Sequence, residues 1–213
     1  MHITLQAAPQ TALAKPLLLD VTISNPGSHA LEIDDPAQSL AIEFHLVDQR
    51  TREDLSFTAG KLTATTFGSA DQYALEVPTK RLITIAPKGS LSYRVDANAK
   101  LYLRPGDFDA FVSHKESQSN RVPVKVVLTR DSVALLFATA RDAQMDYSRR
   151  EWATDRLARL YPGFKLSLAL PTESATARSQ QETTNAPVYT RFAEWWRDQL
   201  TAPDLDQRLD KLR

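Results

Sequence analysis

The feature that most constrains this chain is the alternation of apolar and polar residues in Leu101–Leu128, which reads LYLRPGDFDAFVSHKESQSNRVPVKVVL. A period of two is typical of strands with one buried face. The Pro105-Gly106 pair and the polar tip at 114–121 are turn signals. The segment therefore predicts strands at Phe108–Ser113 and Val122–Leu128 that run antiparallel to each other.

The same alternation recurs upstream, at 17–23, 40–46 and 81–95. The first of these runs ends in Asn25-Pro26-Gly27, a strong turn signal. Spacing between Phe57 and Arg81 is less regular and predicts a long excursion with one or two short strands. Repeated strands separated by turns predict an antiparallel β-sandwich over residues 1–130.

After Thr129 the pattern becomes helical. The run RDAQMDYSRREWATDRLARL at 141–160 lacks Gly and Pro, and its apolar residues fall on one helical face. Asp146–Arg150 and Asp155–Arg159 have the spacing of favourable i,i+4 ion pairs. Tyr161-Pro162-Gly163 predicts the end of this helix. FKLSLAL, at 164–170, alternates and predicts one more strand.

Residues 171–186, PTESATARSQQETTNA, contain Ala as their only apolar residue. Such a segment buries little surface and predicts a polar linker. A helix is expected to begin near Pro187, because proline suits the first helical position. The predicted fold class is therefore mainly β plus α: an antiparallel sandwich at 1–130, then a helical C-terminal region at 131–213 with a polar linker at about 171–186.

Composition excludes several classes of function. Residues 1–130 carry 14 basic and 14 acidic residues and 131–213 carry 12 of each, so no polycationic region predicts nucleic-acid binding. The longest apolar run, VALLFATA from Val133, is too short to span a bilayer, so no membrane insertion is expected. The N-terminus lacks a signal-peptide pattern, which predicts a cytoplasmic protein as given, or a periplasmic one if the chain is a processed product.

Motifs that carry chemistry are missing from the linear sequence. The chain has no cysteine, and His2, His29, His45 and His114 form no ligand-spaced pair, so neither metal nor cofactor is expected. Dispersed glycines exclude phosphate-binding loops, and no G-x-S-x-G motif occurs. We therefore expect no enzyme and no catalytic residue, although a hydrolase site assembled from distant residues stays open.

All three tryptophans lie in the C-terminal part of the chain. On a helix, Phe192 and Trp195 fall on one flank, whereas Tyr189, Trp196 and Leu200 fall on the other. One interpretation is a helix wedged between other elements and buried. The other is a partner-binding surface formed by Tyr189, Trp196 and Leu200, because Trp and Tyr are typical interface anchors.

Three segments resemble immunoglobulin-like domains of bacterial proteins: LRPGDFDAFV, VTISNPGSHALEI and SNRVPVKVVL. The closest families are CARDB-like adhesion modules and small intracellular proteinase inhibitors, and the resemblance covers about residues 3–128. It implies an immunoglobulin-like sandwich in a bacterial protein, and an inhibitor-like member would block a protease. One departure is Phe108, because many such sandwiches have a Tyr there that bonds back to the backbone.

These observations predict a non-enzymatic protein-binding or accessory module whose partner is another protein. The alternative is an inhibitor or immunity-type protein that blocks a protease or a toxin. A protruding loop near 57–80 would favour the inhibitor, and a cleft with converging His and carboxylate side chains would favour an enzyme.

Removal of metals tests the expectation that the fold needs none. Because thiolate ligands are missing and the histidines are dispersed, we expect excess EDTA to leave the thermal midpoint unchanged in a melt followed by circular dichroism. A midpoint lowered by several degrees, and restored by added metal, would contradict the prediction.

Overall fold

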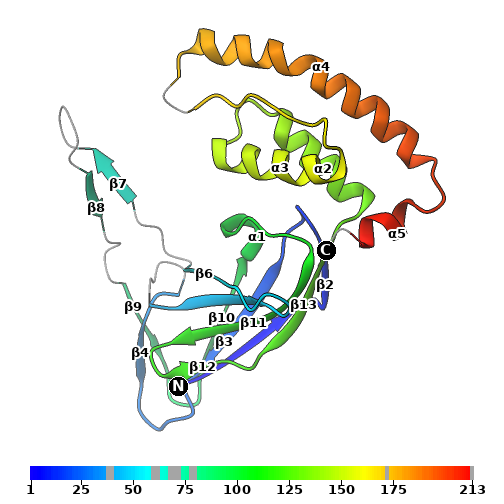
Figure 1. Ribbon diagram of the computed structural model, residues 1–213. Coiled ribbons are helices and arrows are strands. Elements are labelled where there is room, and N and C mark those ends of the chain that lie inside the picture. The colour runs from blue at the N-terminus through cyan, green and yellow to red at the C-terminus, as the bar shows by residue number, and fades with distance from the viewer. Residues whose placement is uncertain (37–40, 59–62, 67–72, 77–80, 171–172, 212–213) are drawn as a thin grey trace. The chain divides into compact units, whose positions relative to one another are not determined.

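The computed structural model describes residues 1–36, 41–58, 63–66, 73–76, 81–170 and 173–211 (Figure 1). The strands are β1 (His2–Ala7), β2 (Gln10–Ala12), β3 (Leu18–Ser24), β4 (Leu31–Asp34), β5 (Glu43–Asp48), β6 (Asp54–Thr58), β7 (Thr63–Thr66), β8 (Tyr73–Glu76), β9 (Leu82–Ile85), β10 (Ser90–Asp96), β11 (Gly106–His114), β12 (Ser117–Gln118) and β13 (Val122–Val127). The helices are α1 (Ala97–Lys100), α2 (Arg130–Arg141), α3 (Tyr147–Leu160), α4 (Ala175–Leu200) and α5 (Leu205–Asp210). Helix accounts for 34% and strand for 32%, so the class is mixed α and β rather than mainly β.

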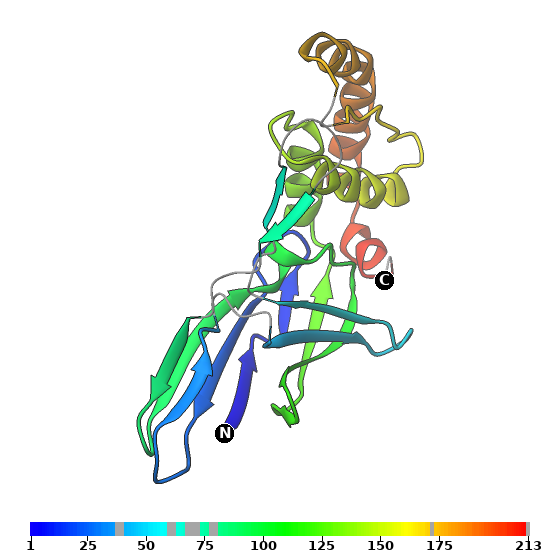
Figure 2. The same ribbon diagram turned by 90° about the vertical axis from the view of Figure 1, so that its left-hand side faces the viewer.

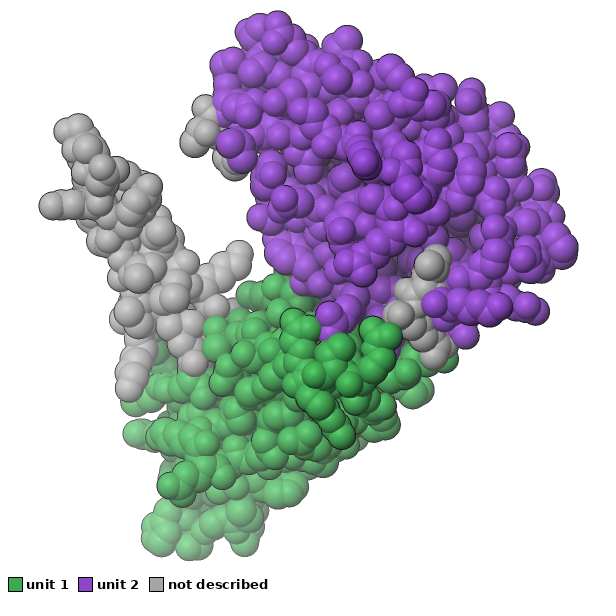
Figure 3. Space-filling model, viewed as in Figure 1, with its two compact units in different colours: residues 1–11, 16–101, 107–125 green, residues 12–15, 102–106, 126–213 purple. Residues whose placement is uncertain are grey.

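Two compact units divide the chain (Figure 3). The sheet unit contains residues 1–11, 16–101 and 107–125, and the helical unit contains residues 12–15, 102–106 and 126–213. Relative to the expected boundary at 130, three short segments of the N-terminal region belong to the helical unit.

Two sheets supply the core of the sheet unit. One has the order β1-β3-β10, and the other has the order β2-β13-β11-β5-β6 with β12 paired to β11. The inward side chains of β3 and β5 are fully buried, and the Phe44 ring meets the Tyr93 ring edge-on at a centroid distance of 6.3 Å. This contact joins β5 to β10, so the two sheets pack against each other through their apolar faces.

The alternation predicted for β11 is present. Phe108, Ala110 and Val112 are fully buried, whereas Asp109 and Ser113 point to the opposite face. Antiparallel pairing sets Ala110 opposite Leu46 on β5. Inward residues of both strands therefore stack into one core, as period-two patterning requires.

Two asparagine side chains stabilise the backbone where strands end or lie at an edge. Asn25 accepts from the N–H of Gly27 through Oδ1 at 3.0 Å and donates through Nδ2 to the carbonyl of His29 at 2.7 Å, which explains the Asn-Pro-Gly turn. Asn120 accepts from the N–H of Leu5 and donates to its carbonyl, at 2.8 and 3.0 Å. That pair occupies backbone groups of β1 that an edge strand leaves open.

The excursion expected between Phe57 and Arg81 contains two short strands, β7 and β8, which pair antiparallel. The rest of that excursion lies outside the described residues, and so does most of the loop near 57–80 on which the inhibitor alternative depends. A second pair, β4 with β9, sets Leu31 opposite Ile85.

Helices α2 and α3 begin at side-chain caps. Thr129 Oγ1 accepts from the N–H of Ser132 at 3.2 Å, and Asp146 accepts from the N–H of Arg149 at 2.8 Å. The expected helix over 141–160 is therefore shorter, because the cap at Asp146 starts it at Tyr147. Of the two predicted ion pairs, Asp155–Arg159 is present at 3.4 Å, whereas Arg150 bonds elsewhere.

Predictions for residues 164–186 are wrong in two respects. Residues 164–170 form neither strand nor helix, and Ser167 bonds through both its N–H and its carbonyl to the amide of Asn185. The expected linker is helical from Ala175, capped by Ser174, and Pro187 lies inside α4 rather than at its start. The cause is tertiary: packing and the Asn185 amide stabilise a helix whose own residues bury little.

Truncation of Phe108 tests the strand phase. Because this ring is fully buried in the core of the sheet unit, we expect Phe108→Ala to lower the free energy of unfolding by about 3–5 kcal/mol in urea denaturation. Leu82→Ala, at an exposed position of β9, is the control and should change it by less than about 1 kcal/mol. Equal effects of the two variants would contradict the placement of Phe108.

Acid should weaken the sheet unit through His114. Burial lowers the pKa of this imidazole below its ordinary value, and the charge of Lys115 lowers it further, against an opposing effect of Asp34. Below pH of about 6.5 the unfolded chain then binds a proton that the folded chain does not, so stability falls as pH falls.

We therefore expect a smaller loss of stability between pH 7.5 and pH 5.5 in His114→Asn than in the wild type, measured by urea denaturation at both pH values. Val112→Ala, which truncates a buried neighbour that does not titrate, should keep the wild-type difference between the two pH values. An unchanged difference in His114→Asn would show that other groups set the pH dependence.

Candidate functional site

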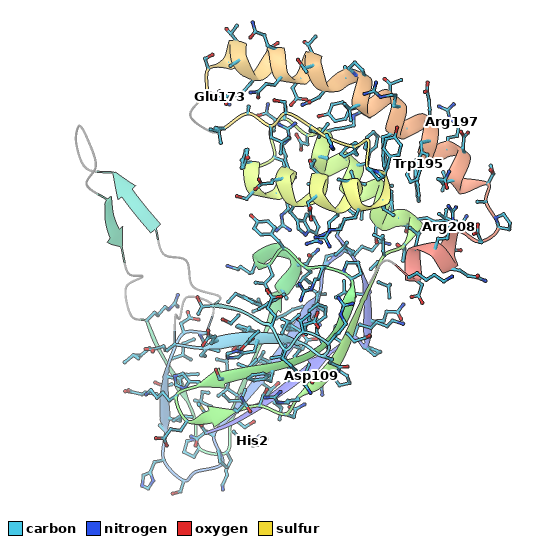
Figure 4. All side chains as sticks on the ribbon, in the orientation of Figure 1. His2, Asp109, Glu173, Trp195, Arg197 and Arg208 are labelled. Atoms are coloured by element: carbon cyan, nitrogen blue, oxygen red, sulfur yellow. The ribbon has the colours of Figure 1, made fainter. Side chains whose placement is uncertain are left out.

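The predicted aromatic helix packs mainly into the core of the helical unit, where α2, α3 and α4 lie together (Figures 1 and 2). Phe192 is fully buried, and its ring centroid lies 4.8 Å from that of Phe137 on α2 and 4.9 Å from that of Phe164. Trp195 stacks on Tyr161 at 5.0 Å (Figure 4). The first flank of α4 is therefore an internal packing surface.

Tyr189 is half-buried and takes part in the same internal packing. Its hydroxyl donates to Glu182 Oε2 at 3.2 Å and lies 3.5 Å from the guanidinium of Arg150. The guanidinium of Arg141 lies 5.5 Å from the centre of the ring. Burial, and then the charge of Glu182, raises the pKa of Tyr189. The structure thus assigns this predicted interface residue to contacts within the unit.

Arg150 is the buried charge of the helical unit. It donates through Nη2 to Glu182 Oε1 at 2.6 Å and through Nε to the carbonyl of Ala140 at 3.2 Å. These bonds connect α3 to α4 and to the end of α2. A buried guanidinium needs such partners because an unpaired buried charge is strongly destabilising.

Trp196 and Leu200 occupy the second flank of α4, one turn apart. Trp196 is half-buried, with its ring centroid 6.1 Å from that of Trp195. Leu200 is 41% exposed near the C-terminal end of the helix. Of the three predicted partner-binding residues, Leu200 is the exposed one, and Tyr189 and Trp196 are both half-buried.

A second candidate site, which was not predicted, lies on the outer face of the larger sheet. Side chains of β5, β6 and β11 that point away from the core share this face, because the register sets Ser56 and Phe111 on either side of His45. The imidazole of His45 is 13% exposed. It therefore lies between two strands and under partial cover.

His45 bonds to side chains from both neighbouring strands. Its Nδ1 lies 2.8 Å from Asp54 Oδ2, and its Nε2 lies 2.8 Å from Ser113 Oγ. Glu43 Oε2 lies 3.8 Å from Nε2. Since a carboxylate only accepts, Nδ1 is the donor to Asp54, and Nε2 of the neutral imidazole then accepts from the Ser113 hydroxyl.

The ring of Phe111 stabilises the orientation of His45. The two rings stack with centroids 4.4 Å apart and an interplanar angle of 7°. The guanidinium of Arg121 lies 4.3 Å from the centre of the Phe111 ring. Because one ring face already holds the imidazole, we place Arg121 over the other face, away from His45.

The set of Ser113, His45 and Asp54 has the order of contacts of a nucleophile, a base and a group that orients the base. The linear spacing of the four histidines does not predict this cluster. The sequence did carry one indication of a shared face: alternation places Asp109 and Ser113 on the outward side of β11 and His45 on the outward side of β5. Only strand pairing shows that these phases meet.

Metal ligation is not indicated by this cluster or by any other group of described residues. Within the parts of the chain that the structure describes, no group of three His, Cys, Asp or Glu side chains is arranged to hold an ion. Among those same residues, no helix is both long enough and apolar enough to cross a membrane.

No protein-family model matches the chain, and no curated protein matches it. Solved structures with partial similarity include a β-glucosidase from Listeria innocua (14% identity, TM-score 0.35), red sea bream transglutaminase (14%, 0.33) and the alkylpurine DNA glycosylase of Pseudomonas fluorescens (10%, 0.36). The matches cover 59%, 61% and 59% of this chain but only 16%, 15% and 30% of those proteins. At these TM-scores the similarities carry no argument about fold or activity.

Proposed function

We propose that this protein is a non-enzymatic protein-binding or accessory module, and that its partner contacts the flank of α4 formed by Trp196 and Leu200. The observation that carries the proposal is the division of the aromatic run of α4. Phe192 is fully buried and Trp195 stacks on Tyr161 within the helical unit, whereas Leu200 is 41% exposed and the half-buried Trp196 lies beside Trp195.

The chemistry of this flank suits another protein. Tryptophan is enriched among the residues that dominate binding energy at interfaces, and a neighbouring aliphatic side chain extends the apolar contact. Arg197 and Asp198 lie beside these residues and are exposed. An apolar centre with charged neighbours has the anatomy of a protein interface rather than of a small-molecule pocket.

We also propose that the sheet unit is an immunoglobulin-like sandwich. The order β1-β3-β10 corresponds to strands A, B and E of that fold, and β13-β11-β5-β6 corresponds to G, F, C and C′. Phe108, on the strand equivalent to F, lies where the corner tyrosine is expected. One departure is β9, which pairs with β4 rather than with the E equivalent.

This proposal supports a binding role only by analogy, because a fold does not define a function. The resemblance of the strand segments to domains of bacterial proteins supports a bacterial origin in the same way. The surface of α4 supplies the specific prediction.

Affinity capture from a lysate of the source organism tests the proposed surface. We expect the wild-type protein to retain one defined protein in stoichiometric amount. In titrations with that purified partner, Leu200→Asp and Trp196→Ala should each weaken binding by about tenfold or more. Leu135→Asp is the matched control, because Leu135 on α2 is also 41% exposed. The proposed surface would be contradicted if all three variants lost affinity for the partner equally, or if all three bound it as tightly as the wild type.

A further inference from the structure

We propose that Ser113 is a nucleophile prepared by His45 and Asp54, that it accepts an acyl group from small activated esters or thioesters, and that the reaction stops at the serine ester. This goes beyond the proposed function, which involves α4 and does not require any reaction at the sheet face. A site that reacts once and does not turn over also differs from an enzyme.

The geometry of three side chains carries the proposal. Ser113 Oγ lies 2.8 Å from Nε2 of His45, and Nδ1 lies 2.8 Å from Asp54 Oδ2. Both distances fall in the range at which a base takes a proton directly from a nucleophile and is itself oriented by a carboxylate. The members come from β11, β5 and β6, three consecutive strands of one sheet.

Packing keeps this arrangement rigid. Phe111 lies directly opposite His45 in the β11–β5 ladder, and the parallel stacking of the two rings limits rotation of the imidazole. With the plane of the ring fixed, both nitrogens stay directed at their partners. Such preorganisation is what separates a reactive serine from an ordinary surface hydroxyl.

The reaction balances as an acyl transfer. The Ser113 hydroxyl gives its proton to Nε2 of His45 while Oγ forms a bond to the carbonyl carbon of the donor. The resulting imidazolium is stabilised by the carboxylate of Asp54. The bond from carbon to the leaving oxygen or sulfur then breaks, and the proton on Nε2 passes to the leaving group. The products are a Ser113 ester and a free alcohol or thiol.

The same sheet explains why the reaction stops there. Backbone N–H groups of paired strands lie in the plane of the sheet, whereas the reacting carbonyl lies above the face with the side chains. They therefore cannot converge on the oxygen as an oxyanion hole does. Arg121 lies across Phe111 from His45. Only a donor with a good leaving group then reacts, and the unactivated serine ester that forms resists attack by water.

Access favours a small donor. Asp54 is 43% exposed and borders the cluster on the side of β6. Ser56 on the same strand is exposed and opposes His45 in the ladder. A small ester can reach Ser113 from the side of Glu43, which opposes Ser113 in the β11–β5 ladder and whose side chain is 46% exposed. Ser56 offers an internal comparison: it is a serine on the same face, next to His45 in register, and its hydroxyl does not bond to the imidazole.

Acetylation by p-nitrophenyl acetate tests the proposal in the full-length protein. We expect a burst of about one equivalent of p-nitrophenolate, a mass increase of one acetyl group, and a peptide map that places the group on Ser113. The acetylation rate of Ser113 should exceed that of Ser56 by about a hundredfold. His45→Gln and Asp54→Asn should lower the Ser113 rate, and Ser113→Ala should remove the burst, whereas Ser56→Ala should retain it.

Several results would overturn the proposal. These are equal acetylation of Ser113 and Ser56 in native wild-type protein, a rate unchanged in His45→Gln, and continued release of p-nitrophenolate beyond one equivalent. The comparison of the two serines within wild-type protein does not depend on whether a variant folds. In denaturant the preference for Ser113 should disappear, because the strands no longer hold the three side chains together.

Discussion

The alternation of side chains along β11 is the constraint on which the sheet unit depends. Because successive residues of a strand point to opposite faces, Phe108, Ala110 and Val112 complete the core while Phe111 and Ser113 reach the outer face. A register shift of one residue would exchange these two sets and expose the core. Burial of Phe108 therefore fixes the position of Ser113 as firmly as it fixes the position of the core.

Strand pairing converts that alternation into a site. Each strand contributes one outward side chain, and the ladder brings His45 between Asp54 and Ser113. A sheet face positions His45 and Ser113 with little freedom, since the backbones of β5 and β11 are bonded to strands on both sides, while β6, which carries Asp54, is the edge strand. The same regularity leaves no backbone donors above the face. This favours rigid presentation of side chains, for binding or for a single covalent event, over catalytic turnover.

In the helical unit, buried polar groups set the course of α4. Arg150 connects α3 to Glu182 and Tyr189, and Asn185 bonds both backbone groups of Ser167. Arg150 and Asn185 must form these bonds within the unit, because burial of their polar groups without partners would be costly. They require the polar first half of α4 to be ordered, and they fix which flank of its aromatic second half faces the core.

The sequence by itself determined what depends on local periodicity: the strands β3, β5, β9, β10, β11 and β13, the burial of Phe108, the Asn25 turn and the two flanks of α4. Tertiary structure alone decided that residues 175–186 are helical and that Tyr189 is used internally, because Asn185, Glu182 and Arg150 act across elements. It also decided the site at His45, whose partners lie 9 and 68 positions away. Periodicity reports which face a side chain occupies; only the pairing of strands and packing of helices determine which side chains meet there.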